Sequence, residues 1–386
     1  MIKRFLKDRL LEKKRSVLLL GPRQTGKSTL CGSLDPDISL NCADSRDFLE
    51  LAQNPDFLFQ LIASKKPKLV FIDEAQKLPR IFNDIQIILD GGRHGTKFLL
   101  TGSSARKLRR GRANLLPGRM HTMYLSPLFC GELGFELDTA DALAFGMLPG
   151  IRTEPDIKER KSLLASYAGT YLQEEIQAES LSRDIGQFGR FLRFAAAYNA
   201  SVLDFGKLSS ESGIRIKTAS RYFEILEDTL IADRCEPFAK SEKKRLVQRP
   251  KYYFFDTGVL NGLLKNFTPS DDRKGRLFET LIYQQLTAMI QNSVDDASRL
   301  SYYRTEHGAE VDFILETRGR LFAIEVKASS NIGVSDLSGL ESFGGFYGKS
   351  CHKIILYTGS RRRRLRDVEI FPWMEFFRDI LMAKAL

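Results

Sequence analysis

A glycine-rich stretch near the N-terminus contains residues that can bind phosphate. It reads Gly21-Pro22-Arg23-Gln24-Thr25-Gly26-Lys27-Ser28-Thr29, which has the spacing G-x-x-x-x-G-K-[ST]. Two glycines let backbone N–H groups approach an anion closely. We expect the ammonium of Lys27 on the β- and γ-phosphates and the hydroxyl of Ser28 at Mg²⁺. The pattern predicts binding of a nucleoside triphosphate, with a chance glycine-rich turn as the alternative.

Two further apolar runs end in residues that suit nucleotide hydrolysis. Residues 69–72 precede Asp73 and Glu74. Asp73 is expected to hold Mg²⁺ through the coordination shell of the ion, and Glu74 is expected to orient and activate the attacking water. Residues 97–100 precede Thr101-Gly102-Ser103-Ser104, in which Ser103 or Thr101 is expected to sense the γ-phosphate. A helix cap at Ser103 or Ser104 is the alternative. The residues assigned to the nucleotide and its metal ion are Gly21, Gly26, Lys27, Ser28, Thr29, Asp73 and Ser103.

The C-terminal third contains residues that suit metal-dependent cleavage of a phosphodiester. Glu279 shares the apolar face of a predicted helix at 278–290, and Asp312 lies among apolar residues of a predicted strand. Strand alternation places Glu325 and Lys327 on one face of the next strand. Asp312 and Glu325, helped by Glu279, are expected to bind Mg²⁺ or Mn²⁺. Lys327 is expected to position or deprotonate water, or to neutralise developing charge. The alternative is a Glu325–Lys327 salt bridge on an edge strand.

The elements that position the N-terminal motifs are strands alternating with helices. Residues 17–20 form an apolar run directly before the phosphate-binding loop, and similar runs precede Asp73 and Ser103. This alternation predicts an open parallel α/β sheet, with the nucleotide at the carboxyl ends of the strands.

The middle of the chain has the outline of a winged helix. Residues 205–213 read as a short helix closed by glycine, and 217–230 read as a second helix. Residues 231–255 read as two strands around a basic tip. Contacts with DNA phosphates are expected from this region, and contact with a protein is the alternative. The nominated residues are Lys217, Arg221, Lys243, Lys244 and Arg245. After the tip, 251–255 read as a strand, and Asp256-Thr257-Gly258 is expected to cap the next helix.

Composition limits the class of protein. The 386 residues carry a net charge of +11, with a pI of about 9.3, which favours an anionic partner such as nucleic acid. The five cysteines are scattered and form no C-x-x-C pair, as expected in a reducing compartment. We find no signal peptide or membrane-spanning run, so the sequence predicts a cytoplasmic protein.

The motifs also resemble known families. The run from the phosphate-binding loop through 71–76 to 99–104 and Leu116-Pro117-Gly118-Arg119 resembles the prokaryotic AAA+ ATPases. That resemblance implies that Arg119 acts on a neighbouring nucleotide, and hence a homo-oligomer, with a structural salt bridge as the alternative. The pattern Glu279, Asp312, Glu325-x-Lys327 resembles the PD-(D/E)XK nuclease superfamily, which implies a mixed sheet with flanking helices.

The whole order resembles a prokaryotic family of AAA+ ATPases with a C-terminal nuclease-like domain. It implies an α/β multidomain protein with a P-loop AAA+ domain at 1–165, a winged-helix domain at 166–250 and a restriction-endonuclease-like domain at 251–386. The expected function is an ATP-hydrolysing, Mg²⁺-dependent, DNA-acting protein whose nuclease site is controlled by nucleotide state. The alternative is an ATP-driven switch or binding module with an inert nuclease-like domain.

Overall fold

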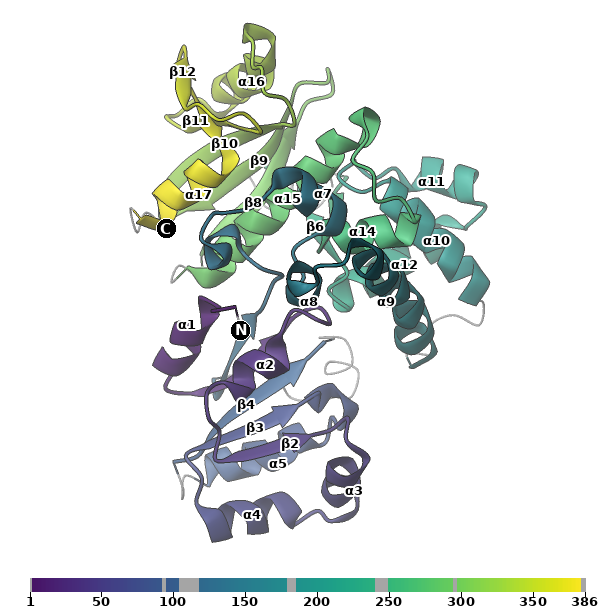
Figure 1. The fold of residues 1–386 in the computed structure, drawn as a ribbon, viewed down its shortest axis with the longest axis vertical. Helices are drawn as coiled ribbons and strands as arrows, with labels where there is room; N and C mark the ends of the chain where they lie inside the picture. Colours follow the sequence, from purple (N-terminus) through teal and green to yellow (C-terminus); the bar gives the residue numbers. More distant parts are fainter. Residues whose placement is uncertain are drawn as a thin grey trace. The chain divides into compact units, whose positions relative to one another are not determined.

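The chain folds as two compact units (Figure 1). A computed structural model describes residues 2–91, 95–103, 118–178, 185–239, 249–293 and 297–382, with only the backbone described at 170–178, 185 and 380–382. The first unit is Met1–Ser126 with Asp228–Ile231, and the second is Pro127–Glu227 with Ala232–Leu386. The three-part division at 165 and 250 stays a prediction beside this two-unit division.

The first unit contains a five-stranded sheet in which every pairing is parallel. This confirms the predicted N-terminal parallel α/β sheet. Its strands, in spatial order, are β2 (Ile38–Asn41), β3 (Leu69–Asp73), β4 (Lys97–Gly102), β1 (Ser16–Leu20) and β5 (Met120–Tyr124). Because β1, β3 and β4 are neighbours, the carboxyl ends that carry the predicted nucleotide residues lie at one edge of the sheet.

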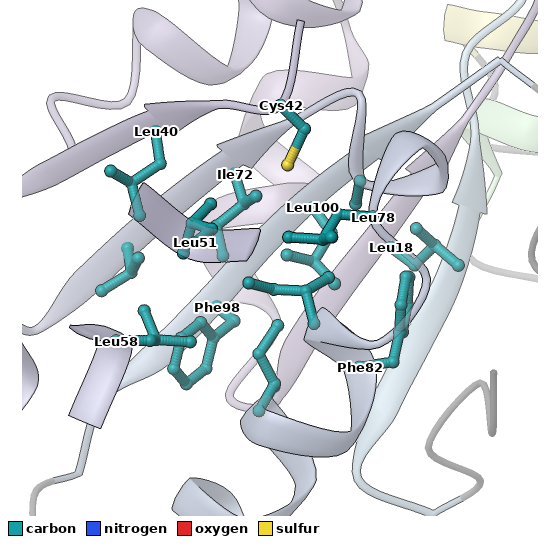
Figure 2. Close-up of a cluster of buried hydrophobic side chains, with 14 of the residues drawn as sticks. Leu18, Leu40, Cys42, Leu51, Leu58, Ile72, Leu78, Phe82, Phe98 and Leu100 are labelled. Carbon is teal, nitrogen blue, oxygen red and sulfur yellow. The ribbon is translucent and has the colours of Figure 1, made fainter. Parts of the chain in front are cut away.

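Helices cover both faces of this sheet, which explains why its central strands are continuously apolar. Leu18 and Leu100 pack with helices α3, α4 and α5 on one face (Figure 2), whereas Val17 and Leu99 pack with α1 and α2 on the other. The helical segments are α1 (Leu6–Glu12), α2 (Lys27–Gly32), α3 (Ser45–Gln53), α4 (Phe57–Lys65), η1 (Ala75–Lys77) and α5 (Ile81–Asp90).

The second unit begins with a helical part. Asp204 caps α11 by accepting from the N–H groups of Gly206 and Lys207, and Gly213 closes that helix at φ 69°, as the sequence predicts. The elements are η2 (Cys130–Leu133), α7 (Thr139–Phe145), α8 (Pro149–Thr153), α9 (Ile157–Ala178), α10 (Ile185–Ala197), α11 (Phe205–Ser212), α12 (Ile216–Asp228), β6 (Ala232–Cys235), β7 (Lys251–Phe254) and α14 (Thr257–Leu264). Strands β6 and β7 pair antiparallel, and the predicted basic tip between them lies outside the described residues. The winged-helix assignment stays a prediction.

A six-stranded mixed sheet forms the C-terminal part of the second unit. Strands β8, β9 and β10 pair antiparallel, whereas β10, β11 and β13 pair parallel. The strands in spatial order are β12 (Arg363–Leu365), β13 (Val368–Pro372), β11 (His352–Tyr357), β10 (Arg320–Lys327), β9 (Glu310–Thr317) and β8 (Arg299–Arg304).

Helices lie on both faces of the mixed sheet. Phe343 of α16 packs in one cluster with Ile314 and Ala323, whereas the ring of Phe313, on the opposite face, lies 6.0 Å from that of Tyr283 on α15. The helical segments are α15 (Asp271–Asn292), η3 (Val334–Leu337), α16 (Ser338–Tyr347) and α17 (Trp373–Met382). No described helix combines the length and apolar character needed to cross a membrane.

Candidate functional site

The phosphate-binding loop connects β1 to α2 and is held by contacts that need glycine at two positions. Gly26 has φ 90°, a conformation that residues with a side chain rarely adopt. A Cβ atom on Gly21 would lie 2.4 Å from the carbonyl oxygen of Leu125. The guanidinium of Arg4 donates to the carbonyl oxygen of Thr25 at 2.6 Å, which fixes the loop from outside. The backbone of the loop is therefore shaped by the first unit itself.

Lys27 points back onto the loop. Its Nζ donates to the carbonyl oxygens of Gly21 and Pro22, both at 2.8 Å, and the residue is only 5% exposed. Burial lowers the pKa of Lys27 to about 8, although Glu74 and Asp73 act to raise it. The ammonium therefore sits where carbonyl oxygens, rather than carboxylates, accept its hydrogen bonds.

Asp73 and Glu74 lie at the carboxyl end of β3, next to the end of β4. The hydroxyl of the fully buried Thr101 donates to Asp73 Oδ1 and accepts from the backbone N–H of Glu74 at 3.0 Å. Ser28 and Thr29, in the first turn of α2, are exposed. An exposed hydroxyl and a buried, oriented carboxylate are the donors that Mg²⁺ takes beside a nucleotide, so Ser28 and Asp73 fit that ion.

Gln76 links the remaining predicted residues, and the sequence analysis did not assign it a role. Its Nε2 donates to Glu74 Oε2 at 2.5 Å and to Ser103 Oγ at 3.1 Å. Its Oε1 is buried and has no hydrogen-bond partner among the described residues. Ser103 therefore reaches Glu74 through Gln76, whereas Thr101 contacts Asp73 directly. The signal in the sequence was a polar amide residue two positions after Glu74, close to the end of the strand.

Arg119 forms an ion pair within the chain. Its guanidinium donates twice to the carboxylate of Asp90, at the end of α5, and both side chains are exposed. Asp90 is therefore the partner of Arg119 in the structural salt bridge that was the alternative prediction. The action of Arg119 on a neighbouring nucleotide stays a prediction.

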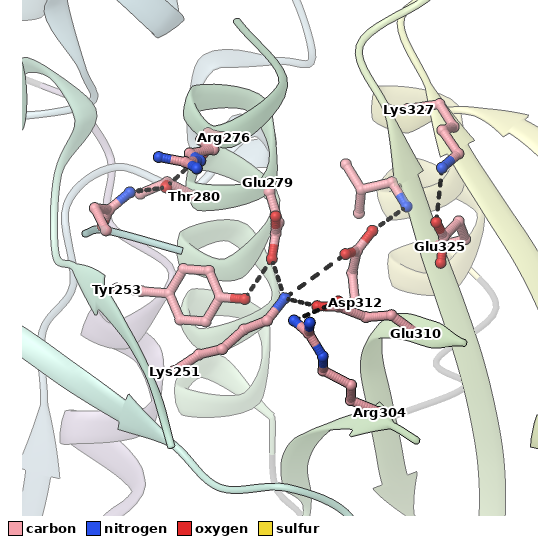
Figure 3. A network of polar contacts seen from close by, with 12 residues as sticks. Lys251, Tyr253, Arg276, Glu279, Thr280, Arg304, Glu310, Asp312, Glu325 and Lys327 are labelled. Atoms are coloured by element: carbon pink, nitrogen blue, oxygen red, sulfur yellow. Dashed lines mark hydrogen bonds and ion pairs between the residues drawn. The ribbon is translucent and has the colours of Figure 1, made fainter. Parts of the chain in front are cut away.

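The C-terminal residues converge in one cleft of the second unit, of about 800 Å³, which Glu279, Asp312 and Glu325 line (Figure 3). Asp312 Oδ2 accepts from the backbone N–H of Val326 at 2.8 Å, so β10 orients the side chain that β9 carries. Glu325 Oε1 accepts from Lys327 Nζ at 2.8 Å. Glu325 Oε2 is buried without a hydrogen-bond partner among the described residues.

Lys251, which the sequence analysis placed only in a strand, lies among these carboxylates (Figure 3). Its Nζ is 2.6 Å from Glu310 Oε1, 2.9 Å from Glu279 Oε1 and 3.9 Å from Asp312 Oδ1. Burial acts to lower the pKa of Lys251, but Glu279, Asp312 and Glu310 together raise it above its ordinary value. Glu279 Oε1 also accepts from the Tyr253 hydroxyl at 2.5 Å. The sequence signal was a lysine directly before the apolar run of β7.

The carboxylates of the cleft outnumber the ammonium groups that face them. Burial, with Glu325 and Glu279, raises the pKa of Asp312 well above its usual range, and burial raises the pKa of Glu325 against the effect of Lys327. In the described ranges, no three or more His, Cys, Asp or Glu side chains are grouped to hold a metal ion. Mg²⁺ commonly takes one or two carboxylates and keeps several waters. Asp312 and Glu325, whose Oε2 has no partner among the described residues, fit such an ion.

The predicted DNA contacts are divided between described and undescribed residues. Lys217 and Arg221, on α12, are exposed, and neither forms a hydrogen bond or ion pair with a described residue. Lys243, Lys244 and Arg245 lie outside the described residues.

Comparison with known families agrees with the N-terminal assignment. The model of a family described as an AAA domain matches residues 13–134. Two families described as domains of unknown function, DUF8612 and DUF4143, match residues 136–270 and 274–376. The match supports an AAA-type ATPase domain over residues 13–134, and such a domain suggests ATP binding and hydrolysis.

Similar proteins occur in mycobacteria. The uncharacterized proteins Rv2008c of Mycobacterium tuberculosis and Mb2031c of Mycobacterium bovis are each 28% identical over 335 residues, covering 85% of this chain and 73% of theirs. Among solved structures, Bacteroides Pif1 bound to ssDNA is 13% identical with a TM-score of 0.26, covering 43% of this chain and 49% of that one. Protein VC1899 from Vibrio cholerae is 11% identical with a TM-score of 0.19, covering 96% and 92%. Likenesses this low carry no argument about fold or function.

Proposed function

We propose that this protein is an ATPase that acts on DNA, and that its nucleotide state controls a Mg²⁺-dependent nuclease site in the second unit. The observation that carries the nuclease part is the convergence of Glu279, Asp312 and Glu325 in one cleft. Lys327 donates to Glu325 Oε1, whereas Glu325 Oε2 has no partner among the described residues. The AAA-type sheet and the phosphate-binding loop support the ATPase part.

In the ATPase site, Lys27 binds the phosphates of ATP. A bound triphosphate offers stronger acceptors than the carbonyl oxygens of Gly21 and Pro22, so the ammonium leaves them for the phosphates. Ser28 and Asp73 would hold Mg²⁺, which neutralises charge that develops on the phosphates. Glu74 orients and activates the attacking water.

In the nuclease site, Asp312 and Glu325 would hold the metal ion, which polarises the phosphodiester and activates water. The Val326 N–H fixes the Asp312 carboxylate, and Lys327 holds Glu325 Oε1 on its strand. Lys327 also brings a positive charge to the site, which suits the negative charge that develops on phosphorus.

Two features support DNA as the substrate. The net charge of +11 favours a polyanion, and Lys217 and Arg221 present two cations at exposed positions of α12. A homo-oligomer in which Arg119 leaves Asp90 for a neighbouring nucleotide is part of the proposal.

A second candidate is an ATP-driven switch whose nuclease-like site binds without cleaving. Lys251 favours it, because its ammonium already neutralises Glu279 and Glu310, two carboxylates that a more extended metal site would use.

The deciding experiment incubates the protein with linear, supercoiled and single-stranded DNA, with Mg²⁺ or Mn²⁺, with and without ATP. We expect cleavage that Asp312→Asn removes while ATP turnover persists, and turnover that Lys27→Ala abolishes. Absence of cleavage under every condition, with ATP turnover and DNA binding intact, would leave the switch as the function. Unchanged turnover in Lys27→Ala would refute the ATPase part.

A further inference from the structure

We infer that Lys251 is a built-in cation of the carboxylate cluster: it takes the place of a second divalent metal ion and restricts the site to one ion, at Asp312 and Glu325. This inference rests on the proposed nuclease site and specifies its metal content.

The surroundings of Lys251 fix its ammonium in place. The residue is 2% exposed, and lysine is almost never that buried unless it is paired. Its backbone pairs with Cys235 of β6 and bridges to Val202, so the strand sets where the side chain begins. Its Nζ lies 5.3 Å from the centre of the Tyr302 ring, a further contact that favours a cation.

Lys251 divides the carboxylates into two groups. Glu279 and Glu310 both contact the ammonium, and Glu310 also accepts from Arg304 at 3.2 Å. Asp312 Oδ1 is farther away, at 3.9 Å. The carboxylate oxygens that remain available to a metal ion therefore belong to Asp312 and Glu325. Glu325 Oε2 is buried and has no partner among the described residues.

Charge makes the two occupants mutually exclusive. In two-metal sites the ions lie about 3.5–4 Å apart and share a carboxylate. Asp312 is the carboxylate that lies between the two groups here, and the ammonium already lies on the Glu279 side of it (Figure 3). A divalent ion placed there would meet a buried positive charge at close range, so the second position is closed to metal.

The test counts bound Mn²⁺ by the electron paramagnetic resonance signal of the free ion. It uses the full chain without nucleotide, in an Asp73→Asn background that removes the carboxylate assigned to the metal ion of the first unit. We expect one Mn²⁺ per chain, lost in Glu325→Gln. We expect two in Lys251→Met, the second lost when Glu279→Gln is added. Lys274→Met, an exposed lysine of α15, serves as the matched control and should bind one.

A second variant tests the inference in case Lys251→Met does not fold. Because Lys251→Met leaves Glu279 and Glu310 without their shared counter-charge, Lys251→Met/Glu310→Gln is measured beside it. Mn²⁺ should raise the melting temperature of both variants more than that of the parent, since the ion replaces the ammonium. The inference is overturned if the folded variants bind as many ions as the parent, or if the parent binds two.

The same measurements distinguish failure of the inference from failure of the proposed nuclease function. A parent that binds no Mn²⁺ would refute both the nuclease proposal and the inference, whereas a parent that binds two and cuts DNA would refute the inference alone. A parent that binds one Mn²⁺ but cuts no DNA would refute the nuclease proposal alone.

Discussion

Replacing Gln76 by methionine should separate the chemistry of ATP hydrolysis from the binding of ATP. The Gln76 amide donates to the Glu74 carboxylate and to the Ser103 hydroxyl, and among the described residues it forms no hydrogen bond with the phosphate-binding loop. Methionine has a similar length and fills the space without donating. The substitution therefore removes what orients Glu74 and leaves Lys27 and the loop unchanged.

The magnitude follows from the bonds removed. A hydrogen bond to a charged group is worth about 1.5–3 kcal/mol, and each 1.36 kcal/mol changes a rate tenfold, so kcat should fall roughly 10- to 100-fold. The KM for ATP should stay within about threefold, because Gln76 contacts neither Lys27 nor the phosphate-binding loop among the described residues. Stability should change little, because Gln76 Oε1 is already buried without a partner among the described residues.

Steady-state ATP turnover and urea unfolding measure the two effects on one preparation. Gln60→Met, at an exposed position of α4, is the matched control and should behave as the parent. A kcat within threefold of the parent would refute the reasoning. So would a raised KM at unchanged kcat, because Gln76 would then act on binding and not through Glu74.

Three other outcomes are expected. Nucleotide affinity should fall above about pH 8, by up to tenfold per pH unit, because the Lys27 ammonium, with a pKa of about 8, must regain its proton to bind phosphate. A nucleotide titration from pH 7 to 9.5 checks this, and the same slope in Lys27→Arg would contradict it. Asp256→Ala should destabilise the second unit by about 2–4 kcal/mol in urea unfolding, because it removes the cap of α14 and the acceptor of the buried Met147 N–H; an effect below about 1 kcal/mol would argue against it. Lys217→Glu with Arg221→Glu should weaken DNA binding and reduce the slope of log affinity against log salt by about two, and an unchanged slope would place DNA elsewhere.

The sequence by itself determined the features that depend on local geometry. A strand followed by G-x-x-x-x-G-K-S specifies the phosphate-binding loop, because the turn needs glycine where φ is positive, as at Gly26. Asp256 was expected to cap the next helix and does so, accepting from the Val259 N–H. Glu325 and Lys327 share a face because side chains alternate along any strand.

Contacts between distant elements were decided only by the tertiary structure. The pairing of β3 with β4 brings Thr101 to Asp73, and the turn after β3 brings Gln76 to Ser103. Lys251 meets carboxylates from α15 and β9 because β7, α15 and the mixed sheet pack together in the second unit. The periodicity of the sequence does not predict such contacts, because they depend on which buried surfaces pack against each other. A lysine that reads as the polar start of a strand therefore becomes the buried cation of the candidate site.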